Sequence, residues 1–278
     1  MKFFIAKLKL INFKNLKFII YKRLYLILKF LNLKILYITN SPKFKSLPYH
    51  YQYFEKIIKI LNENNLNFIL KEKKNLEIGG GEFWGLMPFF IKHGSLSYTN
   101  IDPYSDNNIL KAKKFKKLFN KQIKEYIDIK YIRNFNKSNF SDRIENLKLN
   151  SKYDFIVSVS CLEHVNDVKS LLNNITKVSN NKTEQVHIIN FSNHLSKSHP
   201  FKYLYSNSYE EILNNFDLKI NLLRPSDYFE ILDSINLKYK FIVLDVFDLS
   251  EINLNSYWKK YNKDILKIKS GILVIKKN

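Results

Sequence analysis

The stretch at residues 75–85 holds the residues with the clearest chemical potential in this 278-residue chain. Its sequence, NLEIGGGEFWG, joins a short apolar run at 76–78 to a glycine cluster. Glycine lets the backbone turn tightly and approach a ligand closely, because no Cβ intervenes. A helix that starts at such a turn offers free backbone N–H groups to a polar or anionic ligand. We therefore predict a strand that ends at a nucleotide-cofactor site, followed by a helix that the glycines open.

The spacing of the glycines discriminates between nucleotide cofactors. The dinucleotide fingerprint requires glycine at its first, third and sixth positions, the last so that the helix packs closely on the strand. Counted from Gly79, the sixth position is Trp84, and its bulky indole argues against NAD or FAD. No Lys-Ser or Lys-Thr pair follows the glycines, so the phosphate-binding P-loop is excluded as well. A structural glycine turn without a ligand is the alternative that this stretch alone leaves open.

An acidic residue follows the next predicted strand. Residues 96–101 read as a strand that ends at Asp102, about twenty positions after the glycines. A carboxylate at that place accepts hydrogen bonds from the two ribose hydroxyls of a bound nucleoside. An Asp before a proline, here Pro103, is also a common turn residue. Because Asp102 occurs together with Glu77 and the glycines, ribose binding is the better interpretation.

A third polar cluster follows the most apolar predicted strand. Residues 153–160 are almost continuously apolar, as expected of a strand buried on both faces of a parallel sheet. They lead into the sequence CLEHV at 161–165. A carboxylate such as Glu163 suits the start of a helix because it complements the helix dipole. Glu163 and His164 are therefore as well explained by a structural role as by a catalytic one.

Taken together, these motifs resemble those of the class I S-adenosylmethionine-dependent methyltransferases. Glu77, followed by Gly79, Gly81 and Gly85, is similar to the first motif of that family. The sequence SVSCLEHV, which begins at Ser158, resembles the family's fourth-strand motif, where the strand end lies beside the methyl donor.

The resemblance covers about residues 75–278 and implies a cofactor, a site and an activity. The implied cofactor is S-adenosylmethionine, and the implied activity is methyl transfer, which requires no metal. No convincing cluster of metal ligands is visible in the sequence. The cofactor contacts that the resemblance implies are Glu77, Gly79, Gly80, Gly81, Gly85, Asp102, Ser158 and Val159.

The elements that must position these residues predict an α/β fold. Strand, helix and strand within about thirty residues form a βαβ unit, which requires a parallel sheet and a right-handed crossover. We expect helices at 51–70, 107–126, 208–216 and 226–235, and further strands at 127–132, 153–160, 185–191, 239–247 and 271–277. This order fits the family's Rossmann-like fold, a doubly wound, seven-stranded, mostly parallel sheet with an antiparallel last strand. We divide the chain into a basic, apolar N-terminal helical extension at 1–70 and a methyltransferase domain at 71–278.

The acceptor should meet the loops that follow the fourth and fifth strands, because ligands of open α/β sheets bind beyond the carboxyl ends of the strands. The loop at 193–205 is polar and contains His194. We predict His194, and as second candidate His164, as the base that takes the proton of a hydroxyl acceptor. A loop histidine without chemistry is the alternative. Asp142 is a candidate adenine contact, without a clear motif.

The formal net charge of +21 raises the question of a nucleic-acid partner. Residues 1–54 carry eleven Lys and Arg and no acid, which leaves 35 basic and 25 acidic residues in the remainder. The excess is thus concentrated at the front, and the lysine-rich helix at 107–126 reads as a solvated face. We predict no nucleic-acid partner. An RNA methyltransferase and a non-catalytic protein that binds S-adenosylmethionine are the alternative functions.

The first 40 residues mix apolar side chains with lysines. The longest run of only aliphatic or aromatic residues between charges is residues 24–28, whereas a spanning helix needs about 20 apolar residues and a signal peptide an apolar core of about 7 to 15. A basic, acid-free segment could rest on an anionic membrane surface, or cover the catalytic domain or a partner subunit. The single cysteine, Cys161, fits a reducing compartment. We expect a cytoplasmic protein, with peripheral membrane contact through residues 1–40 as an added hypothesis.

The polar loop and the basic front together favour a small-molecule or glycan acceptor with a hydroxyl group. Sequences of this pattern resemble bacterial methyltransferases of surface-polysaccharide assembly. That resemblance is the basis for the expected acceptor class.

Overall fold

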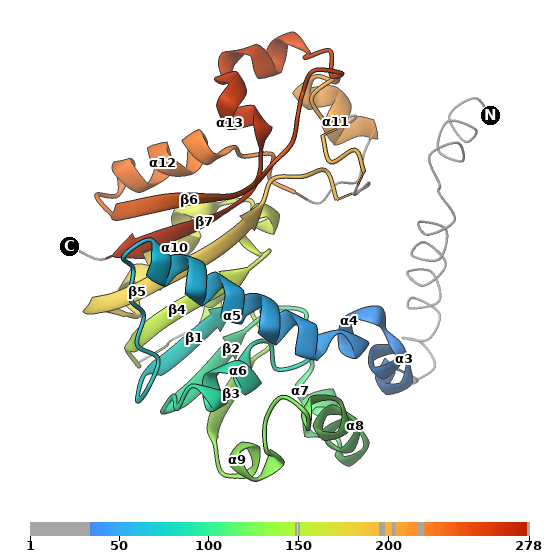
Figure 1. The fold of residues 1–278 in the computed structure, drawn as a ribbon, viewed down its shortest axis with the longest axis vertical. Coiled ribbons are helices and arrows are strands. Elements are labelled where there is room, and N and C mark those ends of the chain that lie inside the picture. Colours follow the sequence, from blue (N-terminus) through green and yellow to red (C-terminus); the bar gives the residue numbers. More distant parts are fainter. Residues whose placement is uncertain are drawn as a thin grey trace.

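The computed structural model describes residues 34–147, 149, 151–194, 198–201, 204–215 and 220–276. Its centre is a seven-stranded sheet with the order β3-β2-β1-β4-β5-β7-β6 (Figure 1). The first five strands run parallel, and β7 is antiparallel to both of its neighbours. The predicted fold class is therefore confirmed. The strands are β1 Lys74–Ile78, β2 Ser97–Ile101, β3 Asn136–Phe140, β4 Tyr153–Val159, β5 Ser179–Asn190, β6 Lys238–Val246 and β7 Ile268–Lys276.

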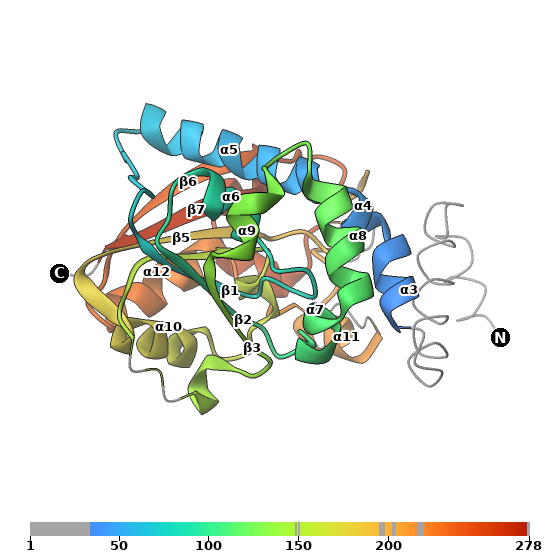
Figure 2. The same ribbon diagram turned by 90° about the horizontal axis from the view of Figure 1, so that it is seen from below.

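Helices cover both faces of the sheet (Figure 2). Strand β4 shows why, because its side chains alternate between the two faces. Phe155 and Val157 belong to the core beneath α5, α6 and α8, whereas Ile156 belongs to the core beneath α10 and α12. The helices are α3 Lys34–Asn40, α4 Pro42–Lys45, α5 Leu47–Glu63, α6 Met87–Lys92, α7 Asn107–Lys111, α8 Lys113–Ile123, α9 Ile129–Arg133, α10 Val168–Lys177, α11 Tyr209–Asn215, α12 Pro225–Ser234 and α13 Lys263–Lys267.

The N-terminal helices are part of the same packed body as the sheet. Helix α5 buries Tyr51, Phe54, Ile57 and Leu61, which recur at helical spacing. The Phe54 ring packs edge-on against Phe89 of α6, with ring centroids 4.8 Å apart. The described part of the predicted extension therefore shares its core with the sheet. Residues 1–33, which hold most of the segment expected to contact a membrane, lie outside the described residues.

Helix α4 extends this N-terminal layer over the end of the sheet where the glycines lie. Its Phe44 ring contacts Phe83 of the glycine-rich loop, with centroids 5.6 Å apart. The preceding helix, α3, is tied to the α7 end by an ion pair of 2.9 Å between Lys34 and Asp106. In the part of the chain that the structure describes, no helix has the length and apolar character needed to cross a bilayer.

The predicted third strand at 127–132 is wrong. That segment contains helix α9, because the Asp128 carboxylate accepts a hydrogen bond from the backbone N–H of Lys130 and caps the helix. The true third strand, β3, has the polar sequence NKSNF. It lies at the edge of the sheet and pairs only with β2, so its residues need not be apolar.

Two predicted helices also differ in their bounds. The glycines do not open a helix directly, since residues 79–86 form turns and α6 begins at Met87. The helix predicted at 107–126 is divided into α7 and α8 by Ala112, which has extended backbone angles. The predicted capping box of α11 is confirmed, because Ser208 and Glu211 each accept the other's backbone N–H, at 3.2 and 2.7 Å.

Candidate functional site

The predicted site residues lie along one edge of the sheet, where the parallel strands end. The glycines follow β1, Asp102 follows β2, and a short 3₁₀ helix at Leu162–His164 follows β4. His194 lies in the loop after β5. Because the chain moves from β1 to β2 on one side and returns to β4 on the other, this edge contains the topological switch point at which such sheets bind ligands.

Backbone N–H groups of the glycine-rich loop bind side chains at the end of β2. The N–H of Gly81 donates to Asp102 Oδ2 at 2.7 Å, and that of Gly80 donates to Asn100 Oδ1 at 3.1 Å. Asn100 in turn donates to Asn139 of β3 at 2.7 Å. These bonds fix the loop across three strand ends. Sequence reasoning missed Asn100, although a polar residue in a strand that is otherwise buried could have signalled it.

Glycine is required at different positions of the loop for different physical reasons. A Cβ on Gly79 would lie 2.5 Å from the Cys161 sulfur, and a Cβ on Gly85 would lie 2.2 Å from a Glu77 oxygen. Both positions are therefore filled by the protein itself. Gly81 has a φ of +70°, and a Cβ there would meet no atom within 4 Å. Gly81 thus adjoins open space beside Asp102, which is where a ligand could approach the backbone.

Glu77 binds the loop from beneath. The side chain is 3% exposed, and its Oε2 accepts hydrogen bonds from the Leu86 N–H at 2.7 Å and the Tyr98 hydroxyl at 2.5 Å. Burial raises the pKa of Glu77 to about 7, and the two hydrogen bonds oppose that shift. Since these contacts are internal, Glu77 positions the loop.

Asp102 lies where a ribose-binding acid is expected. One carboxylate oxygen accepts the Gly81 N–H, and the other accepts the N–H of Tyr104 at 2.7 Å. Tyr104, two residues after Asp102 in sequence, is 80% exposed. The strand end therefore combines an acceptor for hydroxyl groups with an available aromatic ring.

Ser158 and Val159 end β4 next to the glycines, with Ser158 in register with Ile78 of β1. The Ser158 hydroxyl is buried and lies 2.8 Å from Nδ1 of His187 on β5. Burial lowers the pKa of His187 to about 3, so this histidine is neutral. The Ser158 side chain thus connects β4 to β5. A ligand at this strand end would therefore contact the backbone of Ser158 rather than its hydroxyl.

Glu163, His164 and His194 meet at the ends of β4 and β5. His194 Nε2 lies 4.0 Å from Glu163 Oε1, and the two imidazole rings have centroids 5.1 Å apart. The structure therefore brings together the two predicted base candidates. Asn221, which sequence reasoning missed, holds the turn in place by donating from Nδ2 to the carbonyl oxygens of Leu162 and Val165, at 2.8 and 2.9 Å.

Burial dominates the electrostatics of this cluster. It raises the pKa of the Glu163 carboxyl to about 8. It lowers the pKa of His194 to about 4; the neighbouring His164 and, more weakly, Lys43 of α4 add to that shift, and a hydrogen bond to the Asn190 backbone opposes it. Both shifts favour the neutral forms, so the two groups form no ion pair near neutral pH.

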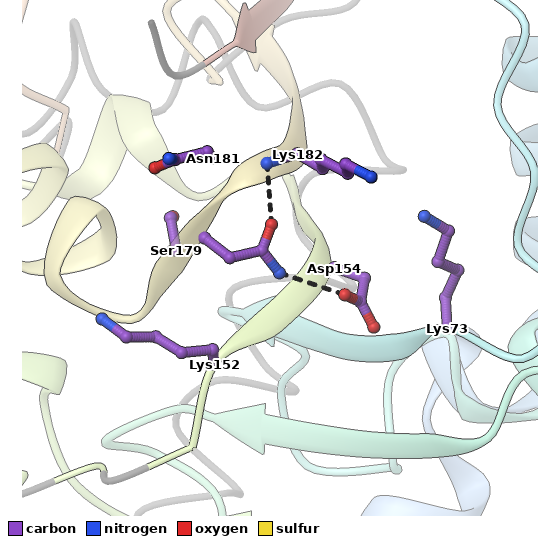
Figure 3. Close-up of a pocket in the computed structure, with 7 residues that line it drawn as sticks. Lys73, Lys152, Asp154, Ser179, Asn181 and Lys182 are labelled. Atoms are coloured by element: carbon purple, nitrogen blue, oxygen red, sulfur yellow. Dashed lines mark hydrogen bonds between the residues drawn. The ribbon is translucent and has the colours of Figure 1, made fainter.

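A surface pocket elsewhere on the protein is a weaker candidate site. It lies at the amino ends of β1, β4 and β5, the edge opposite the glycines (Figure 3). Its central polar groups bind each other, because Asn180 donates to Asp154 at 3.1 Å and accepts the Lys182 N–H at 2.8 Å. Its other lining residues are Lys73, Lys152, Ser179 and Asn181. The hydrogen bonds of Asn180 with Asp154 and Lys182 give these central groups a structural role.

Comparison with known proteins gives a family for the chain. A family model described as a methyltransferase domain matches residues 49–239. No curated protein matches the sequence.

Solved structures with a similar fold include three methyltransferases of low sequence identity. The magnesium protoporphyrin IX methyltransferase from Synechocystis PCC 6803 is 12% identical, with a TM-score of 0.49 over 82% of this chain and 83% of that chain. A putative S-adenosyl-L-methionine-dependent methyltransferase from Methanococcus maripaludis is 15% identical, with a TM-score of 0.49 over 88% of this chain and 92% of that chain. The plantazolicin methyltransferase is 16% identical, with a TM-score of 0.45 over 86% of this chain and 92% of that chain. Likeness at this level says nothing about the acceptor.

Replacing Glu77 with glutamine should remove part of the pH dependence of stability. A carboxyl whose pKa is raised on folding stabilises the fold at low pH, and that contribution is lost as pH rises through about 7. As pH rises from 5 to 8.5, we expect the free energy of unfolding of wild type to fall by about 2 to 3 kcal/mol relative to that of Glu77→Gln. Urea denaturation of both proteins across this range measures the difference. Exposed Glu125→Gln is the control and should follow wild type; parallel curves for wild type and Glu77→Gln would refute the assignment.

Proposed function

We propose a hydroxyl-directed methyl transfer, starting from the premise that this chain belongs to the class I S-adenosylmethionine-dependent methyltransferase family. The proposed acceptor is a small molecule or glycan with a hydroxyl group, in the assembly of surface polysaccharide. The observation that supports a hydroxyl acceptor is the cluster of buried Glu163 with the exposed His164 and His194 beyond β4 and β5.

The residues at the ends of β1 and β2 fit the family's cofactor. The open space at Gly81 lies beside a carboxylate that can accept hydrogen bonds from ribose hydroxyls. We propose that Asp102 holds the ribose, that Gly79, Gly80, Gly81 and Gly85 shape the loop around the methionine part, and that the β4 end at Ser158 and Val159 lines the methyl side. When bound, S-adenosylmethionine supplies an electrophilic methyl group on its sulfonium, and the sulfur keeps the electron pair of the broken bond.

A hydroxyl acceptor must lose its proton when its oxygen is methylated, so a group that takes or releases that proton is needed. We assign this task to the Glu163, His164 and His194 cluster as a unit. His194 has the most suitable position, because its Nε2 faces Glu163 and its side chain is 27% exposed. An acceptor can therefore reach the ring from outside while Glu163 lies behind it. The other contribution of the protein is alignment of the two substrates.

The alternative functions have weaker support. The lysines of α8 lie on its exposed side, and Phe115, Phe119 and Ile123 pack inward, so no aromatic platform for RNA bases accompanies the charge. A protein that only binds the cofactor would not need the buried carboxylate of Glu163 beside two histidines.

Asp102→Ala should weaken the binding of S-adenosylmethionine by about 10- to 100-fold. The reason is the loss of hydrogen bonds to a charged acceptor, each worth about 1.5 to 3 kcal/mol. Isothermal titration calorimetry with the full chain measures the effect. The control is Glu125→Ala, an exposed acid outside the site, which should bind like wild type. An unchanged affinity for Asp102→Ala would show that the carboxylate does not hold the ribose.

Incubation with S-adenosylmethionine carrying a labelled methyl group, and with fractionated bacterial extract, tests the acceptor class. We expect label in a small-molecule or glycan fraction and in a form that survives mild alkali, because an ether does and a methyl ester does not. His194→Ala should lower the rate by about 10²- to 10⁴-fold with little change in cofactor affinity. Label that mild alkali releases, or that ribonuclease solubilises, would overturn the proposal.

A cytoplasmic location with peripheral membrane contact is a separate proposal, and the membrane contact depends on the sequence of residues 1–40. Their basic residues and lack of acids favour anionic lipid. In co-sedimentation, we expect the full chain to bind vesicles that contain anionic lipid, and not purely zwitterionic ones, with binding that weakens as salt is raised. Equal binding to both vesicle types would exclude the electrostatic explanation.

A further inference from the structure

Glu163 differs from most buried acids in that its carboxylate makes no hydrogen bond to the described residues. Its side chain is 3% exposed, and neither carboxylate oxygen makes a hydrogen bond of normal geometry with the described residues. The backbone N–H groups of Glu163 and Asn190 and the Ser160 hydroxyl are near enough to oppose the effect of burial only in part. A buried polar group without a partner is costly, and native proteins rarely keep one without a reason. A ligand that binds this carboxylate would supply the reason.

The side chains around Glu163 have the chemistry of metal ligands. One atom each from Glu163, His164 and His194 lies within 4.8 Å of the other two. Metal–ligand bonds of about 2.0 to 2.2 Å place neighbouring ligand atoms about 3 to 4 Å apart. The Glu163 to His194 distance of 4.0 Å already fits, and small side-chain rotations would bring in the third ligand. The cluster is thus close to the size that an ion requires.

The support behind the ligands also fits. A histidine that binds a metal usually donates its other ring N–H to a carbonyl or carboxylate, which fixes its orientation. The backbone of Asn190 lies near enough to the His194 ring to oppose part of the pKa shift that burial causes, so it is the group in place for this role. The loop itself is braced next to it, because the Asn193 N–H donates to the Pro200 carbonyl at 2.7 Å.

We infer that Glu163, His164 and His194 form a binding site for one divalent transition-metal ion. Two imidazoles and one carboxylate suit Zn²⁺, Mn²⁺, Fe²⁺, Co²⁺ or Ni²⁺ better than Mg²⁺, which prefers oxygen ligands. Three protein ligands leave coordination positions open. If the proposed hydroxyl methylation is correct, an open position would take the acceptor's hydroxyl oxygen and make its proton easier to remove. The site then replaces the metal-free chemistry that the sequence led us to expect.

Equilibrium dialysis tests the inference without any assay of activity. The full chain, free of a polyhistidine tag and treated with a chelator, is dialysed against Zn²⁺ alone, and Co²⁺ is used in parallel for its visible absorption spectrum. We expect one ion per chain. His194→Ala and Glu163→Gln should each lower the affinity by at least about 10-fold. The matched control is His199→Ala, an exposed histidine of the same loop outside the cluster, which should bind like wild type.

Three results would overturn the site: fewer than one ion per chain, equal affinities for His194→Ala and His199→Ala, or a Co²⁺ spectrum that is the same in His194→Ala as in wild type. S-adenosylmethionine binding by each variant checks that it is folded, and the partly exposed His194 provides a test even if Glu163→Gln is unstable. The methyl-transfer assay separates this inference from the proposed function. Methylated hydroxyl product without metal binding rejects the site alone, whereas metal binding with a different product class rejects the acceptor alone.

Discussion

The candidate site depends on a buried carboxylate beneath the glycine-rich loop. Glu77 receives the Leu86 N–H and the Tyr98 hydroxyl, so it joins the loop that leaves β1 to the middle of β2. A carboxylate that accepts two hydrogen bonds in a water-free setting is a strong fixed point, because the alternative is an unpaired buried acid. The space at Gly85 is filled by the same carboxylate. Glu77 therefore accounts for the glycine at position 85 and for the connection between the loop and β2.

The strand order then brings the distant motifs together. Strands β1 and β4 are neighbours although 74 residues lie between Ile78 and Tyr153 in sequence. Gly79 consequently packs against Cys161, and the motif after β4 lies beside the motif after β1. On the other side, Asn100 of β2 donates to Asn139 of β3, and Asp102 after β2 accepts the Gly81 N–H of the loop. The parallel sheet thus forms the site from short polar segments that have no contact along the chain.

Sequence reasoning placed the strands and the segments that follow them correctly where local pattern and burial agree. The apolar run of β4, the glycines and the acid after β2 each have a physical cause that the sequence displays. It failed at β3, because an edge strand needs no apolar alternation and its polar residues resemble a loop. It also missed Asn100 and Asn221, whose roles follow from neighbours in space. The contact between Glu163 and His194 could not be predicted, since about thirty residues and a whole helix and strand separate them.

The two buried acids of the site, Glu77 and Glu163, have contrasting surroundings. Glu77 and Glu163 are each 3% exposed and lie at the ends of adjacent parallel strands, yet their hydrogen bonding to the described residues differs. Glu77 is bound by two donors from the protein, and its role is complete within the chain. Glu163 lies 4.0 Å from the His194 ring, whose pKa partial burial lowers, and its carboxylate oxygens make no hydrogen bond to the residues that the structure describes. A packed protein could relieve that cost by a small substitution, such as glutamine. Because no described residue compensates the acid at this position, at the edge where an acceptor must enter, the proposed metal ion is the partner that would compensate it.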